Sequence, residues 1–527
     1  MKKVFIFFLL AITFASCNKD FLDRSPLDQL SSSTFWTSEK EVTAALNGLY
    51  NGWEIGDNIV YMDCASDNAY GPFPWEGFQV LGNGLLTAAD PGTSRWSFST
   101  VRKCNYFIAN VDKAPISADK IKLSKGQARF IRAYQYFIME QVYGDVPLFT
   151  KELTIEEANK VTRTPKADVV KFVLDELAAV AADLPAKYDN AADQGRITKG
   201  AALALKARIE LYEKKYTECV STCNAISALG QYDLFPSYTD LFRIQNENNQ
   251  EVILDVQYKE NDYSNWVLGV MVPASQGGWS SIDPLQSLVD AFEMKNGKTI
   301  TEAGSGYNAL KPYSNRDPRF YTTIWYPGAA LYDGSNMNPL DKNSADFYDQ
   351  YGGARTGYNV RKYIWNLSDY SDVWNTGMNI IVIRYAEVLL SYAEAKIELG
   401  QIDNSVYTAI DKVRLRAGMP AVDRSVYNDQ TTLRNLIRRE RRVEFGMEGL
   451  RWFDIQRWKI GEQVMKGEAL GSLNAGSIDQ ATGQMIFSPT ATPIIVETRD
   501  FKANNYLWPI PQKQIDINSN LKQNPGY

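Results

Sequence analysis

Apolar residues recur at helical spacing along much of this chain and predict a mostly α protein. Between residues 127 and 142, Ile131, Tyr134, Ile138 and Val142 fall on one face of a helix. The same spacing predicts further helices over 165–184, 198–213, 216–228, 384–399 and 403–417. Another helix is expected to begin after Thr37 or Ser38, because either hydroxyl can cap the Glu-rich turn that follows.

Two pairs of these predicted helices form similar hairpins. The stretch Ala207–Leu211 (Ala-Arg-Ile-Glu-Leu) resembles Ala395–Leu399 (Ala-Lys-Ile-Glu-Leu), and a second helix follows each after a short turn. Small residues allow paired helices to pack closely, which is typical of tetratricopeptide-type repeats. Two unrelated antiparallel hairpins remain an alternative interpretation, because the match to the full repeat pattern is loose.

Two segments differ from this helical background. Residues 60–97 and 255–380 are rich in Gly, Pro, Asn, Tyr and Trp and contain few helical stripes. Long irregular segments of folded proteins are usually functional loops. The predicted architecture is therefore a helical-repeat scaffold that carries two loop-rich insertions.

The first residues have the pattern of a lipoprotein signal peptide. Lys2 and Lys3 precede an apolar run over 4–14, which is too short to span a bilayer, and small residues lead directly to Cys17. Lipidation of Cys17 would anchor the chain to a membrane surface. An ordinary signal peptide with an incidental cysteine is the alternative. The predicted organisation is a signal peptide over 1–16, a lipidated cysteine and tether over 17–35, and a single domain over 36–527.

Composition excludes several classes of function. The net charge is −6, whereas nucleic-acid binding needs a basic face. The chain contains no histidine, which excludes Ser-His-Asp and Cys-His catalysis as well as His-ligated zinc. No later segment reaches 18 unbroken apolar residues, so no membrane-spanning helix is expected.

Four cysteines follow Cys17. Cys219 and Cys223 lie four residues apart in a predicted helix, where a disulfide fits poorly, so buried thiols are expected. A bridge between Cys64 and Cys104 is possible but does not follow from the sequence. These cysteines do not indicate a disulfide-based scaffold in so long a chain.

A further set of short segments, spread in order over nearly the whole chain, is distinctive in combination. The set comprises Asp20–Asp23, Phe35–Trp36, Ala45–Tyr50, Arg129–Tyr134, Val142–Pro147, Arg316–Phe320, Arg384–Leu390, Tyr392–Ala395, Val413–Gly418, Arg438–Phe445, Gly449–Trp458, Leu507–Pro511 and Asn524–Tyr527. Together these segments resemble the SusD/RagB family of outer-membrane nutrient-binding lipoproteins of Bacteroidetes.

The resemblance carries expectations about fold, location and partners. It implies four tetratricopeptide-like helix pairs that support an irregular ligand-binding half. It also implies a lipid-anchored protein on the cell surface at the outer membrane, with a SusC-like TonB-dependent transporter as partner. The usual cargo is an oligosaccharide, although some relatives take peptides or other nutrients.

Aromatic residues in the loop-rich segments are the candidate ligand contacts, because Trp and Tyr can cover the flat C–H face of a sugar ring. Trp279 lies among glycines and serines, which favours an exposed indole, and Trp75 follows a Pro-rich stretch. Asp67 and Asn68 resemble the polar ligand-side segment of the family. A buried, structural role remains the alternative for all four residues.

Trp325 and Tyr307 are weaker candidates of the same kind. Trp325 would equally fit the core beside Phe320 and Tyr321. By contrast, the segment Arg438–Glu444 alternates arginine with glutamate, which indicates a solvated or bridging charge lattice instead of an anion site. Gly449–Trp458 is assigned to the core because of its apolar spacing.

The sequence favours a binding protein over an enzyme. Its motifs include no nucleotide or metal signature and no fixed pair of catalytic carboxylates, so we expect no cofactor, with a structural calcium ion left open. A surface glycoside hydrolase is the first alternative, because an anchor and exposed aromatics suit it equally well. A structural surface protein or lid without its own ligand is the second.

Overall fold

The computed structural model describes residues 35–364, 366–479 and 481–527. The predicted signal peptide, Cys17 and nearly all of the predicted tether lie outside these residues. Within the described part of the chain, no helix is both long and apolar enough to cross a membrane.

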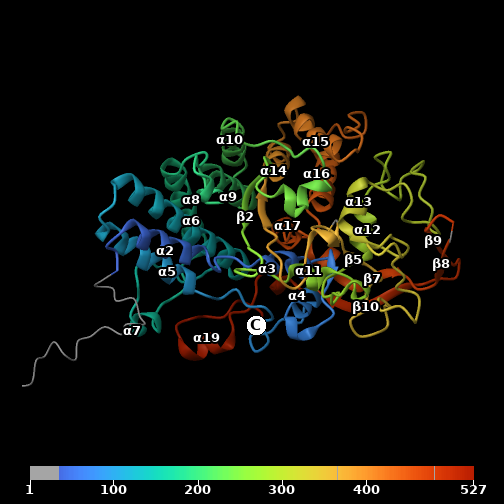
Figure 1. The fold of residues 1–527 in the computed structure, drawn as a ribbon, viewed down its shortest axis with the longest axis horizontal. Coiled ribbons are helices and arrows are strands. Elements are labelled where there is room, and N and C mark those ends of the chain that lie inside the picture. Colours follow the sequence, from blue (N-terminus) through green and yellow to red (C-terminus); the bar gives the residue numbers. More distant parts are fainter. Residues whose placement is uncertain (1–34, 365, 480) are drawn as a thin grey trace, which may run out of the picture.

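The chain is mostly helical, as predicted, and its long helices gather in one part of the molecule (Figure 1). These helices are α2 (Glu39–Tyr50), α5 (Ser99–Asn110), α6 (Ala118–Tyr143), α8 (Lys166–Asp183), α9 (Lys199–Tyr212), α10 (Tyr216–Ser227), α14 (Tyr385–Glu398), α15 (Asn404–Arg416), α16 (Gln430–Glu444) and α17 (Arg451–Trp458). They pack in sequence, α6 against α8, α8 against α9, α9 against α10, α10 against α14, and α14 against both α15 and α16.

Helix starts follow the predicted capping chemistry. Ser38 is the N-cap of α2: its Oγ accepts the Glu41 N–H, and the Glu41 carboxylate accepts the Ser38 N–H, which forms a capping box. α6 begins at Ala118, nine residues before the predicted range, because Ser117 caps an additional polar stretch there.

The two predicted helix hairpins are present as α9–α10 and α14–α15. Both first helices end in the same way, with a left-handed residue and a bond from the next N–H back to the helix: Lys215 N–H to Glu210 O at 2.7 Å, and Gln401 N–H to Lys396 O at 2.9 Å. The left-handed residue is Lys214 in the first hairpin and Gly400 in the second. The similar sequences Ala207–Leu211 and Ala395–Leu399 do not occupy equivalent positions relative to these helix ends, because their alignment is shifted by two residues.

The other part of the molecule contains only short elements, as its composition predicted. The helices are α3 (Gly56–Tyr61), α4 (Gln79–Asn83), α11 (Val267–Met271), α12 (Gln286–Ala291) and α13 (Pro318–Thr323). The strands β1 (Ala69–Tyr70), β3 (Asp283–Pro284), β4 (Ile324–Trp325) and β5 (Asn359–Val360) form two-stranded ladders, β1 with β3 and β4 with β5. A third ladder, of β2 (Val252–Val256) with β6 (Ile380–Arg384), leads into the helical part.

The C-terminal region holds strands that the sequence pattern did not predict. β7 (Lys466–Leu473) pairs with β10 (Pro493–Asp500), and β8 (Gly476–Ile478) pairs with β9 (Met485–Phe487). β7 has the sequence Lys-Gly-Glu-Ala-Leu-Gly-Ser-Leu, which has little β propensity and no strict alternation. Its pairing with β10, and not its own sequence, therefore accounts for the strand. The described chain has three further short α-helices: α7 (Ile155–Ala158), α18 (Gly461–Val464) and α19 (Gln512–Ile517).

All four cysteines of the described residues are buried free thiols. This confirms the expectation for Cys219 and Cys223 and excludes the possible bridge between Cys64 and Cys104. Burial raises the pKa of the Cys104 thiol to about 12, so it stays protonated at neutral pH.

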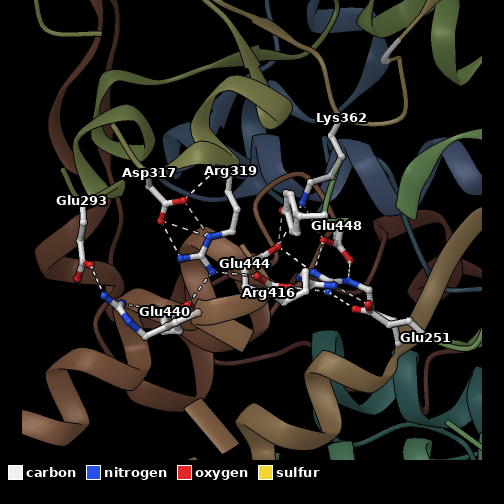
Figure 2. A network of polar contacts seen from close by, with 12 residues as sticks. Glu251, Glu293, Asp317, Arg319, Lys362, Arg416, Glu440, Glu444 and Glu448 are labelled. Atoms are coloured by element: carbon white, nitrogen blue, oxygen red, sulfur yellow. Dashed lines mark hydrogen bonds and ion pairs between the residues drawn. The ribbon is translucent and has the colours of Figure 1, made fainter. Parts of the chain in front are cut away.

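A buried network of ion pairs joins the helical and loop-rich parts (Figure 2). It connects α13, α15 and α16 with Glu251, just before β2, and with Arg384 at the end of β6. Its labelled members in the figure are Glu251, Glu293, Asp317, Arg319, Lys362, Arg416, Glu440, Glu444 and Glu448. Glu440 and Glu444 belong to the segment Arg438–Glu444, so the predicted charge lattice is confirmed in its bridging form and is buried.

The partners in this lattice differ from helix neighbours. Arg441 pairs with Asp454 at 3.1 Å and with Glu394 at 3.5 Å, and not with Glu444 three residues along. The segment Gly449–Trp458, which contains Asp454, is mostly buried, in agreement with its structural assignment.

Candidate ligand-binding surface

A short ladder brings the two loop-rich segments together. In β1, Tyr70 lies opposite Asp283 of β3 and Ala69 lies opposite Pro284. Because the pairing is antiparallel, the chain that leaves β1 toward Trp75 and the chain that enters β3 from Trp279 are at the same end of the ladder. The two strongest predicted contacts therefore come from loops that start side by side.

Trp75 is part of an aromatic group on the surface. Its side chain is 66% exposed, and it stacks on the buried ring of Phe73 with centroids 4.9 Å apart and planes 22° apart. Tyr351, 81% exposed, lies beside both rings, 5.5 Å from Phe73 and 6.5 Å from Trp75. Phe73 thus supports two exposed rings whose planes differ by 30°.

Trp279 is exposed as well, at 53%, and is supported by a second indole. Its ring centroid lies 4.8 Å from that of Trp374, and Trp374 Nε1 donates a hydrogen bond to Gly277 O at 3.1 Å. Gly269 allows this arrangement, because a Cβ there would lie 2.4 Å from the Trp374 ring. The Trp279 indole is therefore held in place and not merely left in solvent.

The exposed aromatic residues have a common location. Among the residues that the structure describes, the most exposed aromatic side chains are Trp75, Tyr263, Trp266, Trp279 and Tyr351. All five belong to the loop-rich segments 60–97 and 255–380. Aromatic rings elsewhere in the described chain are more buried, so this part of the molecule is distinctive in presenting ring faces to solvent.

Asp67 and Asn68 are placed differently from the expectation of ligand-facing residues. Both are buried; Asp67 receives two hydrogen bonds from Arg451, at 2.7 and 2.9 Å, and pairs with Arg442 at 3.1 Å. These guanidinium groups outweigh burial and lower the pKa of Asp67 to about 2. Asn68 is bonded to Asp63 and Arg442. The structure therefore gives both side chains protein partners that hold the start of β1.

Trp325 and Tyr307 are also removed from the exposed rings. Trp325 is fully buried in β4, where it contacts Tyr332 and lies under the Arg361 guanidinium, which corresponds to the core alternative. Tyr307 is partly buried, and the Arg316 guanidinium lies 5.8 Å from its ring. Neither ring is among the most exposed aromatic side chains of the described residues.

Two carboxyl groups lie close to the exposed rings in sequence. Glu76, next to Trp75, accepts a hydrogen bond from the Tyr61 hydroxyl at 2.9 Å, and burial raises its pKa. Asp283 in β3 is fully buried, its Oδ2 accepts the Arg355 N–H at 2.7 Å, and burial raises its pKa well above the usual range. Within the described residues, no group of three or more Cys, Asp or Glu side chains is arranged to hold a metal ion.

Sequence reasoning missed Tyr351, Trp266 and the supporting role of Trp374. Tyr351 stands in Asp349-Gln350-Tyr351-Gly352-Gly353, and its flanking glycines resemble those of Trp279. That local signal was present. Its proximity to Trp75, by contrast, depends on tertiary packing between segments almost 280 residues apart.

The arrangement of a helical-repeat scaffold with an aromatic, loop-rich surface defines a class of binding protein, and comparison with known proteins identifies its family. The family model described as "SusD family" matches residues 241–527, more than half of the chain, and the model described as "Starch-binding associating with outer membrane" matches residues 20–211. The chain belongs to the SusD/RagB family, as its sequence segments predicted.

Individual relatives agree along almost their whole length. A SusD-like carbohydrate-binding protein from Bacteroides fragilis is 32% identical, with a TM-score of 0.83 over 93% of this chain and all of that one. A SusD-like protein from Bacteroides ovatus is 27% identical over 86% of this chain and 82% of its own length. Surface glycan-binding protein A from Bacteroides thetaiotaomicron, solved with laminarihexaose, is 21% identical and shares the fold, with a TM-score of 0.68 over 93% of this chain and all of that one.

Proposed function

We propose that this protein binds a glycan at the bacterial surface through the exposed rings of Trp75, Trp279 and Tyr351. The observation that carries the proposal is that the most exposed aromatic side chains of the described chain all lie in the two loop-rich segments. Phe73 and Trp374 support these rings from below, so they lose little conformational freedom when a sugar stacks on them. The carbohydrate-binding relative from Bacteroides fragilis supports the same class of ligand.

The family and the first residues support the rest of the role. We infer that Cys17 carries a lipid that holds the protein at the outer membrane, and that the protein delivers its ligand to a SusC-like TonB-dependent transporter. A Cys17→Ser variant is expected to move from the membrane fraction to the soluble fraction. The transporter should co-purify with the wild-type protein from solubilised outer membranes. A variant that stays in the membrane fraction would contradict the anchor.

Glycan binding is tested directly by affinity electrophoresis against laminarin, starch, xylan, mannan and mucin glycans, followed by calorimetry with the retained one. Each stacked ring contributes about 1 kcal/mol, so Trp75→Ala and Trp279→Ala should each weaken binding about fivefold, and the double variant about 25-fold. Ile155→Ala, which truncates an 83%-exposed side chain on α7, is the matched control and should leave affinity unchanged. Retention that is equal in wild-type and double-variant protein would overturn the proposal.

The protein is proposed to bind its ligand without breaking it and without a cofactor. A hydrolase would need carboxyl groups beside the stacked sugar, and Glu76 is the one adjacent to Trp75. A long incubation with the retained glycan should yield no reducing ends. Product that appears with wild-type protein and disappears in Glu76→Gln would establish the hydrolase alternative instead. A peptide ligand, the other alternative in the family, predicts that none of the five glycans is retained.

A further inference from the structure

Two neighbouring cavities beside the helical part of the molecule share lining residues, and we call them together the amide groove. Their volumes are about 480 and 500 Å³, and Gln194, Gly195, Arg196 and Asp255 line both of them. The walls come from the end of α2, from the segment 186–198 between α8 and α9, and from β2. Trp75, Trp279 and Tyr351 line neither cavity, so the amide groove is distinct from the aromatic surface described above.

Tyrosine rings in the groove walls are fixed by their hydroxyl groups. Tyr50 Oη accepts the Ile197 N–H at 3.0 Å, and the Tyr188 hydroxyl donates to Ile197 O at 3.1 Å. The Tyr232 and Thr198 hydroxyls are bonded to each other at 3.1 Å. Three rings from different elements are thus bound to the same two-residue stretch. Their positions do not depend on a ligand.

Tyr263 is the most exposed ring in the groove, at 37%. It stacks on Tyr258 with centroids 5.4 Å apart and planes 13° apart, and its hydroxyl accepts the Gly52 N–H at 3.1 Å. One face is therefore supported by protein, and the exposed part of the ring is held rigidly. This is the geometry that a flat, apolar ligand face requires.

Side-chain amides are the most frequent kind of polar side chain in the lining. Those that bear on recognition are Asn47, Asn51, Gln194, Gln231, Asn248 and Gln257. An amide both donates and accepts hydrogen bonds, so it matches a hydroxyl group in either role. The segment that carries Gln194 is held close to the opposite wall, because a Cβ on Gly195 would lie 1.9 Å from the Gln257 amide.

Charges in the groove are largely compensated. Arg196, at the junction of the two cavities, pairs with Asp193 at 2.7 Å and donates a hydrogen bond to Asn47 at 3.0 Å. Burial raises the pKa of Asp255 to about 7, so this carboxyl is partly protonated at neutral pH. Asp262 pairs with Lys259, and Lys187 and Asp189 are exposed charges of the second cavity. The walls around Tyr263 therefore present mainly rigid rings and uncharged or paired hydrogen-bonding groups.

We propose that the amide groove is a second binding site, specific for a neutral polyhydroxylated ligand, namely a saccharide. The Tyr263 ring covers a sugar face, and the amides of Asn51 and Gln194 bind its hydroxyl groups. The proposal goes beyond the glycan surface of the loop-rich part. It shares with that proposed function the class of ligand, and Tyr263 is itself one of the exposed rings of segment 255–380, but none of Trp75, Trp279 and Tyr351 lines the groove.

Crystals of the protein soaked separately in glucose, galactose, mannose, xylose, arabinose and fucose test the site without knowledge of any linkage. Density for at least one sugar against Tyr263 is the expected result. An amide groove that is empty with all six sugars would overturn the proposal. Sugar seen only at Trp75, Trp279 or Tyr351 would also overturn the groove proposal and would support the first site. Sugar seen only in the amide groove would support the groove proposal and count against the first site.

Variants extend the test to solution. Saturation-transfer NMR with the sugar seen in the soaked crystals should give signals that persist in the Trp75→Ala/Trp279→Ala double variant. With Tyr263→Ala introduced into that background, affinity should fall about fivefold or more. Tyr263→Phe keeps the ring and loses only the bond to Gly52, so it should retain binding and serves as the control for folding. Equal loss in Tyr263→Phe and Tyr263→Ala, or no loss in either, would contradict the role of the ring.

Discussion

Arg384 Nη1, at the end of β6, donates a 2.6 Å hydrogen bond to Glu444 Oε1 of α16, and neither side chain reaches solvent. The same guanidinium also bonds Glu251 and both oxygens of Glu448. One cation thus contacts three buried carboxylates, which come from two parts of the chain. The strand that enters the helical part is fixed to α16 by charge as well as by packing.

Removal of this cation is expected to destabilise the whole domain. Arg384→Met would leave Glu444, Glu448 and Glu251 with fewer partners, and an uncompensated buried charge costs about 3–5 kcal/mol. Urea unfolding measures the loss. Arg434→Met, which breaks a partly exposed pair with Glu398, is the matched control and should cost about 1 kcal/mol or less. Equal effects of the two variants would show that burial of the network is not what matters.

Asp67 should contribute stability that disappears in acid. Its pKa is about 2 in the folded protein, below the ordinary value of 3.8, so the unfolded chain binds the proton first. The stabilisation is present above pH 4 and is lost as the pH falls toward 2. Asp67→Asn should therefore cost about 2 kcal/mol at pH 7, and the difference from wild type should shrink between pH 4 and pH 2. A difference that is independent of pH would contradict the ion pairing.

Asp57 should give stability the opposite pH dependence from Asp67. Burial raises its pKa to about 7, and its Oδ1 is buried without a hydrogen-bond partner in the described part of the chain. The folded protein thus holds a proton that the unfolded chain releases, and stability falls as the pH rises from about 4 to 7. Asp57→Asn should stabilise the protein by about 1 kcal/mol or more at pH 8 and have little effect at pH 4. Thermal unfolding of the variant and the wild-type protein at pH 4 and pH 8 measures these differences in stability.

Phe73 is expected to affect ligand binding without contact with ligand. It is buried and supports the rings of both Trp75 and Tyr351, so Phe73→Ala should free both rings and weaken glycan binding about tenfold. Phe73→Leu fills part of the space and should have an intermediate effect. Calorimetry gives the affinity, and a melting curve separates it from general destabilisation. Unchanged affinity in a folded Phe73→Ala protein would show that the rings need no support.

Substitutions in the two hairpin turns are expected to change stability in opposite directions. Lys214 and Gly400 occupy the same left-handed position, which favours glycine. Lys214→Gly should stabilise the protein by about 0.5–1 kcal/mol, and Gly400→Ala should destabilise it by about 1 kcal/mol, although a Cβ at Gly400 would meet no atom within 4 Å. The opposite signs would be lost if side-chain contacts, and not the backbone, controlled these positions.

The helical scaffold was predictable because its signals are local. Each signal depends on residues that are neighbours in the sequence. Examples are the apolar stripe of Ile131, Tyr134, Ile138 and Val142 and the helix caps at Ser38 and Gly400. β7 and β10 were not predictable in the same way, because β7 becomes a strand through pairing with residues 20 or more positions away. Leu211 and Leu399 end two similar sequence segments but lie at different distances from the ends of their helices. Local sequence similarity therefore did not predict which residues of the two hairpins are equivalent.

The candidate site was predictable only in part. The small residues around Trp279 and the prolines around Trp75 indicated exposed rings, and both rings are exposed; ligand binding by them stays a prediction. Asp67 was also a candidate in the sequence, but the arginines that pair with it, Arg442 and Arg451, lie about 380 residues away. No local pattern could have revealed that a polar residue was already occupied.

The pairing of β1 with β3 has a consequence for how this protein diversifies. Two residues on each strand set the register of loops that are more than 200 positions apart in the chain. Insertions or exchanges beyond the ladder, toward Trp75 or Trp279, leave that register and the helices behind it untouched. A change of ligand preference would therefore require changes only in these loop tips, while the helical body behind the ladder keeps its fold.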